Sequence, residues 1–359
     1  MNKLSAIILA SFLLAGCDGN PFSTDDVIID DETDIIDDDD DGNPIASDRV
    51  LPPGTSSPTP QTGIFRREAR GTGAFHGNGY ANNISYDSDS DTFHVQGLAF
   101  DDIQPQGTPY NRAAGVNLGT RFAAYEAPAF VPDDITEAPI GQYQHRAIYG
   151  VSASGDTELA IVRTGSYTGY GFGGFIYQRN NDVVLPTQGQ AVYTGQYAGL
   201  RDFNGAGGLE YTTGNMEVSI DFGGFSDNCT GARCTDAVRG YVRDRQVYDL
   251  AGTNITSGIL DAINAEDNAN LIQLPTLVFA VGPGVMDANG EITGTVDSTF
   301  TDNEGRTIRL DNGNYYAIMS GDHTSGAGGE IVGIIVVESS DRRNEGVTVR
   351  ETGGFIVDR

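Results

Sequence analysis

The chain has 359 residues and a mass of 38.1 kDa, which is enough for two or three domains with cores of their own. It carries 50 acidic and 21 basic residues, a formal charge of −29. A polyanionic partner would be repelled, so nucleic acid is excluded as a target. The 48 glycines, 16 tyrosines and 16 phenylalanines, with no tryptophan, favour a soluble β-rich protein over a helical bundle.

The first residues carry an export signal. Lys3 precedes an apolar run over 4–16 whose length fits a secretory signal peptide better than a membrane-spanning helix. The run ends in Leu14-Ala15-Gly16-Cys17, which resembles the bacterial lipobox, where a small residue precedes the cysteine that receives lipid. We therefore predict a lipoprotein signal peptide over 1–16 and an acylated Cys17, carrying palmitate-like chains, that holds the protein on a membrane. An ordinary signal peptide that contains a cysteine is the alternative.

Residues 17–62 are predicted to form a disordered tether. Eleven of the seventeen residues over 25–41 are acidic, and LPPGTSSPTP follows over 51–60. Like charges at this density repel one another and prolines stiffen the chain, so the segment stays extended. A calcium-binding or acidic binding tail is the alternative for the charge run. The rest of the chain, 63–359, is acidic in its own right, with 37 acids against 19 arginines.

An all-β, antiparallel body is predicted from Gly63 onward. Short runs with alternating, β-branched or aromatic residues, each broken by turn residues, indicate a sandwich or barrel. The runs cover 83–86, 92–100, 142–151, 157–163, 174–178, 190–198, 208–211, 216–222, 238–248, 276–281, 291–300, 315–320, 330–337 and 354–357.

Turn and helix signals divide these strands. Gly and Asn favour hairpin turns at 213–215, 287–290, 303–305 and 311–313. One helix is predicted from Ser257, as N-cap, to Asn264, with Pro275 preventing its continuation. Pro186 and Gly189 mark a boundary within 180–189, between a strand-rich lobe and a C-terminal barrel.

The C-terminal half resembles a known family. The motifs AVYTGQY (191–197), GGLEY (207–211) and MEVSIDF (216–222) are similar to the opening of the barrel domain of transferrin-binding-protein-B-like surface lipoproteins. The motifs GEITG (290–294), YY (315–316), GGEIVG (328–333) and GGF (353–355) follow in the family's order. The resemblance implies a handle-like lobe over 63–186 and a small eight-stranded β-barrel over 187–359.

The same resemblance carries expectations about location and partners. It implies a body displayed at an outer membrane, on the cell surface, with an outer-membrane exporter and an integral receptor as partners. The family's binding surfaces lie on variable loops, so no ligand residue is carried over. The chain has room for one handle and one barrel, whereas larger members have two of each, and transferrin itself is not inferred.

Two cysteines remain once Cys17 is assigned to lipid. Cys229 and Cys234 enclose a short polar loop, and in an exported protein such a pair indicates a disulfide. A redox or metal role is the alternative. The histidines are dispersed and never at metal-ligand spacing, so no metal is assigned to them. They are His76, His94, His145 and His323.

Other motifs have simpler explanations than catalysis. Asp87, Asp89 and Asp91 alternate as in calcium loops, but a solvated hairpin turn needs the same residues. The pattern GYGFGG (169–174) matches a dinucleotide fingerprint, yet a strand follows it where a helix is required. Acidic pairs such as Asp101 with Asp102, or Asp133 with Asp134, are explained by the abundance of surface acids.

The sequence therefore predicts a lipid-anchored, non-catalytic binding module without a cofactor, whose loops capture a protein or a nutrient carrier. Loop aromatics, among them Tyr167, Tyr170 and Phe172, are candidate contacts, although core packing explains each of them as well. A structural accessory lipoprotein on the periplasmic face is the second hypothesis. A hydrolase is the third, and it lacks an assembled nucleophile, metal or acid–base set.

Overall fold

The structure, a computed structural model, shows two packed β-sheet lobes. It describes residues 45–47, 63–71, 78–96, 109–133, 135–166, 169–225, 237–281, 286, 289–326 and 328–359. Within this range the helical segments are α1 (Thr256–Glu266) and the short 3-10 helix η1 (Phe222–Phe225), and strands dominate the rest. The predicted all-β class is confirmed.

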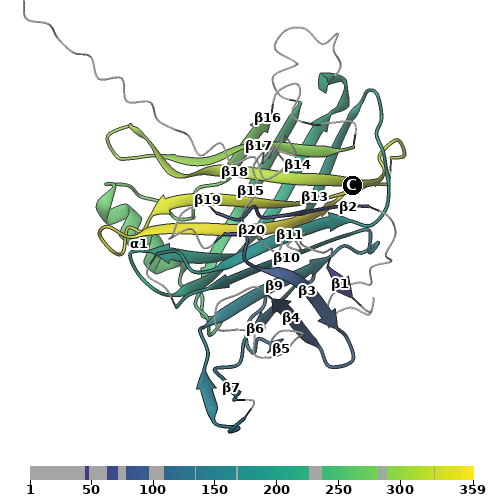
Figure 1. Cartoon of the computed structure of the whole chain (residues 1–359). Helices are drawn as coiled ribbons and strands as arrows, with labels where there is room; N and C mark the ends of the chain where they lie inside the picture. The colour runs from purple at the N-terminus through teal and green to yellow at the C-terminus, as the bar shows by residue number, and fades with distance from the viewer. Residues whose placement is uncertain are drawn as a thin grey trace, which may run out of the picture.

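The N-terminal lobe, called the handle lobe below, is a curled nine-stranded sheet in the order β1-β3-β4-β5-β6-β9-β10-β11-β2. Two further strands form a separate hairpin that projects from it (Figure 1). The sheet strands are β1 (Ala46–Ser47), β2 (Ile64–Arg67), β3 (Asn82–Asp87), β4 (Thr92–Gln96), β5 (Pro109–Arg112), β6 (Phe122–Glu126), β9 (His145–Val151), β10 (Thr157–Thr164) and β11 (Gly173–Arg179), and the hairpin strands are β7 (Phe130–Pro132) and β8 (Pro139–Gly141).

The C-terminal lobe is a closed antiparallel barrel of eight strands, as predicted. Each strand pairs with its neighbours in sequence, and the last strand pairs with the first, so the ring closes. The barrel strands are β13 (Gln190–Asn204), β14 (Leu209–Asp221), β15 (Val238–Tyr248), β16 (Leu277–Val281), β17 (Glu291–Thr301), β18 (Thr307–Asp322), β19 (Glu330–Ser340) and β20 (Thr348–Asp358). The short β12 (Val183–Val184) pairs in parallel with β18.

Alternation of side chains fills the barrel. On β14, Met216, Val218 and Ile220 join the interior core, whereas Glu217 and Ser219 lie between them on the outer face. The same alternation on the other strands brings a single apolar cluster together inside the ring. An eight-stranded barrel is just wide enough for side chains to fill, so this interior is a packed core.

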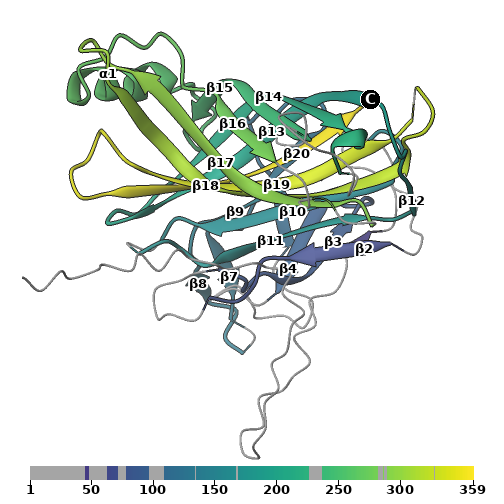
Figure 2. The ribbon, with the colours of Figure 1, turned by 90° about the horizontal axis from the view of Figure 1, so that it is seen from above.

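The two lobes share a second core. Strands β10 and β11 of the handle lobe lie against β19 and β20 of the barrel (Figures 1 and 2). Leu159, Ile161 and Phe175 from the handle lobe join Leu200 and Ile356 from the barrel in one buried cluster. Because β9, β10 and β11 are covered on both faces, all their residues are buried.

Two predicted turns lie inside long strands. Residues 213–215 continue β14 through a register shift, and 311–313 belong to β18 beside another shift. Gly313 is needed there because an added Cβ would lie 1.9 Å from the Val336 carbonyl oxygen. The turn at 303–305 is confirmed, with Gly305 at φ +81°. The prediction at 287–290 lies partly outside the described residues.

The predicted helix is present with different ends. It begins at Thr256, one residue before the predicted N-cap Ser257, and the Thr256 hydroxyl accepts a hydrogen bond from Val247 N at 2.8 Å. It ends at Glu266, well before Pro275, where Asn268 takes a left-handed conformation at φ +50°. Figure 2 shows α1 lying across one end of the barrel.

Part of the predicted tether belongs to the sheet. Ala46 and Ser47 pair in parallel with Ser85 and Tyr86 on β3, and Ile45 is buried in the core of the handle lobe. The Ile45 amide also donates to Gln178 Oε1 at 2.9 Å. The prediction of disorder is wrong for residues 45–47, because Ile45 gains a buried position. The other residues of 17–62 lie outside the described range.

Candidate functional site

The interior of the barrel becomes charged at the end that α1 covers. Arg201 lies on β13, Arg245 on β15, Asp311 on β18 and Glu351 on β20. All four side chains are at most 9% exposed. The inward alternation that places Tyr197 in the core continues along β13 to Arg201, and the same spacing places Asp311 and Glu351 inside the ring. Arg245 faces inward because β15 has an irregularity just before it, where Asp244 takes φ +53°.

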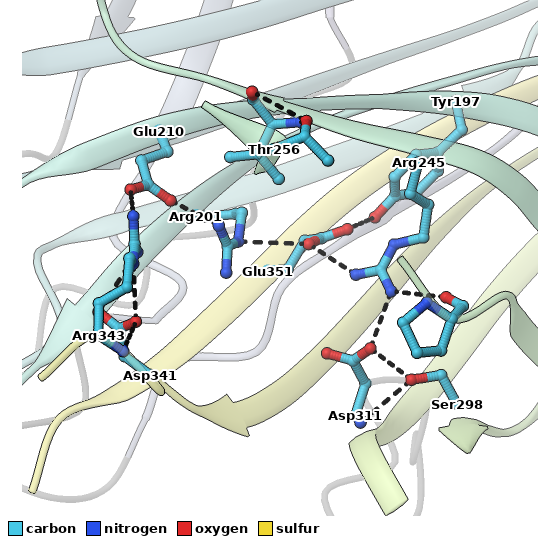
Figure 3. Close-up of polar contacts among 12 residues, drawn as sticks. Tyr197, Arg201, Glu210, Arg245, Thr256, Ser298, Asp311, Asp341, Arg343 and Glu351 are labelled. Atoms are coloured by element: carbon cyan, nitrogen blue, oxygen red, sulfur yellow. Dashed lines mark hydrogen bonds and ion pairs between the residues drawn. The ribbon is translucent and has the colours of Figure 1, made fainter. Parts of the chain in front are cut away.

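These charges hold one another in a chain of contacts (Figure 3). Arg245 Nη1 donates to Asp311 Oδ2 at 2.8 Å, and its Nη2 donates to Glu351 Oε2 at 3.0 Å. Arg201 Nε lies 3.5 Å from the same Glu351 oxygen. Tyr197 donates its hydroxyl hydrogen to Glu351 Oε1 at 2.8 Å. Each buried carboxylate at the centre is therefore matched by an arginine.

The chain of charges continues outward to the loop between β19 and β20. Arg201 Nη1 donates to Glu210 Oε2 at 2.5 Å, and Arg343 Nη1 donates to Glu210 Oε1 at 2.6 Å. Arg343 Nε in turn donates to Asp341 Oδ1 at 2.8 Å. We call Asp341, Arg343, Glu210, Arg201, Glu351, Arg245 and Asp311 the charge chain (Figure 3).

The charge chain shifts the pKa values of several of its members. Burial raises the pKa of Asp311, but the Arg245 guanidinium and the Ser298 hydroxyl outweigh this effect, and the pKa lies below the usual value. Burial lowers the pKa of Arg245, but Asp311 and Glu351 raise it above its usual value. The pKa of Tyr197 lies well above its usual value because of burial and the neighbouring Glu351.

This arrangement is poorly suited to acid–base or nucleophilic chemistry. The hydroxyls of Tyr197 and Ser298 donate to Glu351 and Asp311, two carboxylates that Arg245 also contacts, so neither hydroxyl faces a free general base. The cavity between the charge chain and Ile259, Ile263 and Leu274 measures about 20 Å³. That volume holds about one water molecule and admits no substrate. The charge chain acts as a structural clamp at the closed end of the barrel.

A buried ion pair within the handle lobe also reaches the barrel through a hydrogen bond. Arg163 of β10 makes a two-point contact with Glu68, with Nη1–Oε2 and Nη2–Oε1 distances of 2.9 and 3.1 Å. Arg163 Nη2 also donates to Thr352 Oγ1 on β20 at 2.8 Å. The Arg163 side chain is fully buried. These contacts and the shared core fix the handle lobe on the outer face of the barrel.

Several predicted residues lie outside the described range. They are Cys17, Cys229, Cys234, His76, Asp101, Asp102, Asp134 and Tyr167. Acylation of Cys17 and pairing of Cys229 with Cys234 therefore stay predictions. Among the described residues, no group of three or more His, Cys, Asp or Glu is arranged to hold a metal ion. No helix of the described range is long and apolar enough to cross a membrane.

The described histidines are separate from one another. His145 is buried beside Tyr110, with ring centroids 6.2 Å apart, and burial lowers its pKa to about 4. His323 lies at the other end of the barrel from α1, where Tyr193 Oη is 2.6 Å from its Nδ1. Burial also lowers the pKa of His323 to about 4. His94 is half-buried on β4.

The loop aromatics are packed. The Tyr170 hydroxyl lies 3.0 Å from Thr348 Oγ1, and the Arg350 guanidinium lies 4.5 Å from the Tyr170 ring centroid. Phe172 makes an edge contact with Tyr80, with ring centroids 4.9 Å apart. The glycines of 169–174 serve close packing, because a Cβ on Gly171 would lie 1.7 Å from the Thr164 carbonyl oxygen. The strand β11 follows them, as predicted.

The alternating aspartates form a turn. Asp87 Oδ1 accepts hydrogen bonds from the Asp89 and Ser90 amides at 2.9 and 3.4 Å. Asp91 Oδ1 accepts from the Tyr125 hydroxyl at 2.9 Å. The backbone and hydroxyl groups thus occupy these carboxylates, which agrees with the predicted turn.

Two features of the outer surface were not predicted from the sequence. The hairpin of β7 and β8 exposes Phe130, Ile135 and Ile140. The outer face of β13 to β15 has an open hollow of about 740 Å³ beside Val192 and Tyr241. Apolar residues around the acidic turn in FVPDDITEAPIG (130–141) were the available hairpin signal. Exposure on the barrel wall depends on which strands the handle lobe covers, which no local pattern reveals.

Comparisons with solved structures return transferrin-binding protein B, the family that the sequence resembles. A double mutant of the Haemophilus parasuis protein is 10% identical, covers 76% of the chain and 44% of that structure, and has a TM-score of 0.34. Intact Ap-TbpB, with its N and C lobes, is 11% identical, covers 74% and 44%, and has a TM-score of 0.32. The chain spans less than half the length of these proteins. No protein-family model and no curated protein matches the chain.

Proposed function

We propose that this chain is a lipid-anchored, non-catalytic binding protein of the bacterial cell surface. The acyl group on Cys17 holds it in the outer membrane, the acidic segment that follows keeps the body away from the lipid, and outward-facing side chains capture a protein partner. An outer-membrane exporter and a receptor are its expected envelope partners.

The filled barrel is the observation that carries this proposal. Apolar side chains occupy the interior, and the charge chain and α1 close one end over a cavity of about 20 Å³. A barrel packed in this way has no room for a small ligand or a substrate. Recognition is therefore assigned to the outer surface, where side chains on a rigid scaffold contact a partner.

The lipid anchor is tested with the full chain. We expect metabolic labelling with palmitate and partition into the detergent phase, and we expect Cys17→Ser to abolish both. Cys229→Ser is the matched control, because it removes a cysteine that the proposal does not assign to lipid. A Cys17→Ser chain that keeps its label and stays in the detergent phase would contradict the anchor.

Surface display and capture are tested together on living cells. Protease added to intact cells should cut the tether and release the body, whereas a periplasmic protein would stay intact. Immobilised full-length protein in detergent should then retain a reproducible partner from culture medium or envelope extract, identified by mass spectrometry. Intact chains after protease treatment would contradict surface display, and failure to retain any partner would contradict the binding role.

A further inference from the structure

The hairpin of β7 and β8 gathers exposed apolar side chains on a projecting element. Phe130 is 65% exposed, Ile135 is 91% exposed and Ile140 is 38% exposed. Among the residues that the structure describes, the two strands pair only with each other, apart from both large sheets, and β7 projects from the far side of the handle lobe (Figures 1 and 2). The register pairs Phe130 with Gly141 and Ile140 with Val131, so Phe130 and Ile140 face opposite sides of the hairpin, and Ile135 lies in the turn at its tip. Single exposed apolar residues are common, but three on one short projecting hairpin indicate a contact surface.

The tip of the hairpin is held in a fixed shape. Asp133 Oδ1 accepts hydrogen bonds from the Ile135 amide at 3.1 Å and from the Thr136 amide at 2.7 Å. The Thr136 hydroxyl donates to the same oxygen at 2.7 Å. Ile135 is thereby presented to solvent by an ordered turn. A side chain ordered before binding loses less conformational entropy when a partner takes it up.

The prolines limit how a partner can bind the hairpin. Pro132 lies opposite Pro139, and neither residue has an amide hydrogen to donate to a neighbouring strand. Edge strands with proline resist the addition of another strand. Recognition of this hairpin therefore depends on insertion of side chains rather than on extension of its sheet.

The acidic residues around the exposed apolar side chains determine which kind of partner the hairpin can bind. Residues 126–141 contain Glu126, Asp133, Asp134 and Glu137 and no lysine or arginine. Arg146 neutralises Glu126 at the base of the hairpin, with an N–O distance of 2.9 Å, whereas at the tip Glu137 is exposed and Asp133 is partly exposed. An anionic lipid surface would repel this tip, and a basic protein surface would attract it.

We propose that the hairpin Phe130–Gly141 is the docking element for a partner protein. Ile135 at the tip enters an apolar pocket, Phe130 contacts the partner from one face of the hairpin, and Glu137 with the partly exposed Asp133 meets lysine or arginine on the rim of the pocket. At the base of the hairpin this chain has a hollow of about 290 Å³, lined by Glu126, Pro128, Gln142 and Tyr143 among others. The rim of the partner's pocket rests in this hollow. This inference rests on the proposed function, for which it names the contact site and the chemistry of the partner.

Photocrosslinking on intact cells tests the site. The full chain carries p-benzoylphenylalanine in place of Ile135, or in place of Ile272, which is 92% exposed beyond α1 and serves as the matched control. A third chain carries it in place of Val192, which is 54% exposed on the barrel wall. We expect a crosslinked protein from position 135 and none from 272 or 192. The linked peptide should contain apolar residues beside lysine or arginine.

Affinity measurements with the crosslinked protein, once purified, test the chemistry. Ile135→Asp should weaken binding at least tenfold, and Ile272→Asp should change it less than twofold. Glu137→Gln should weaken binding severalfold and reduce its dependence on salt, because it removes one charge from the rim contact. Equal affinities for Ile135→Asp and the unchanged chain would overturn the proposal.

The outcomes separate this inference from the proposed function. Crosslinks from 192 or 272 but not from 135 overturn the hairpin site and leave surface binding standing. A crosslink from 135 to a second copy of this chain, or flotation of the protein lacking its lipid with vesicles of anionic phospholipid, also overturns it. Absence of a protein crosslink from all three positions contradicts the hairpin site, and the proposed function then fails only if the full-length protein also retains no partner.

Discussion

At the scale of single residues, the charge chain inside the barrel makes its members dependent on one another. Glu351 contacts both Arg245 and Arg201 in a buried site. Glu351→Gln keeps the size of the side chain but leaves these guanidiniums without their shared carboxylate. Breaking a buried ion pair in this way costs about 3 to 5 kcal/mol of the free energy of unfolding, which urea denaturation measures.

The control for Glu351 is an exposed pair on the same barrel. Glu217 lies 2.9 Å from Arg243, with the two side chains 32% and 45% exposed. Glu217→Gln should therefore cost less than about 1 kcal/mol. Similar losses for the two variants would show that the charge chain is weaker than its geometry indicates.

The buried imidazoles make stability depend on pH. Burial lowers the pKa of His145 from 6.5 to about 4, so the unfolded state binds its proton more readily than the folded state does. This contribution to stability is complete above pH 6.5 and is lost as the pH falls toward about 4. Urea unfolding between about pH 7 and about pH 5 should show the decline.

His145→Phe tests this assignment. Phenylalanine keeps a ring beside Tyr110 and removes the titrating group. The variant should lose less stability than the unchanged chain across the same pH range, with the buried His323 supplying part of what remains. A variant with the same pH dependence as the unchanged chain would show that His145 does not contribute.

Sequence reasoning failed at Asp311 for a physical reason. Asp-Asn-Gly over 311–313 has the residue types of a hairpin turn, yet Asp311 lies in the barrel because Arg245, 66 residues earlier, compensates its charge. The local sequence shows that a residue is polar and favours solvent. It does not show whether a distant strand supplies a partner of opposite charge. The same limit hid the Arg163 and Glu68 pair.

At the scale of elements, the positions of the barrel strands were predicted well and their lengths poorly, whereas β2, β5, β6, β7 and β8 of the handle lobe were not predicted. The bounds of β15 match the predicted 238–248, because turn residues end the apolar alternation on both sides. In β14 and β18, glycine and asparagine accompany register shifts inside long strands, so two predicted turns are absent. A glycine marks a place where the backbone bends or another chain comes close, and only tertiary contacts decide which.

The helix α1 stabilises the barrel by covering its charged end. Ile259, Leu260 and Ile263 are buried against Val247, Leu274 and Phe300. Ile263→Ala should lower the free energy of unfolding by about 2 to 5 kcal/mol, since it leaves a cavity in this layer. Asp261→Ala, on the exposed face of α1, should change it by less than about 0.5 kcal/mol. Equal effects would mean that α1 does not seal the barrel.

At the scale of the whole molecule, the two lobes should unfold together. Leu159 packs so closely on β20 that a Cβ added to Gly354 would lie 2.6 Å from its side chain. The shared core and the buried Arg163 add to this contact. The sequence predicted the two lobes, but their contact depends on pairings between distant residues.

Tryptophan probes measure this coupling. The chain has no tryptophan, so Tyr80→Trp reports on the handle lobe and Tyr241→Trp on the barrel. We expect both fluorescence changes at the same urea concentration. In a Leu159→Ala background both midpoints should fall together. Two separate midpoints in the unchanged background would show that the lobes fold independently.

The ring is sealed by β20, which lies between β13 and β19 and also supports the handle lobe. A polypeptide that is synthesised from its N-terminus therefore lacks the eighth barrel strand until residue 358 has been made. It also lacks one of the barrel strands that lie against β10 and β11 of the handle lobe. Until that moment β13 and β19 have open edges, and neither lobe has its full core. Closure of the barrel and completion of the core that the two lobes share therefore both depend on the last strand to be synthesised.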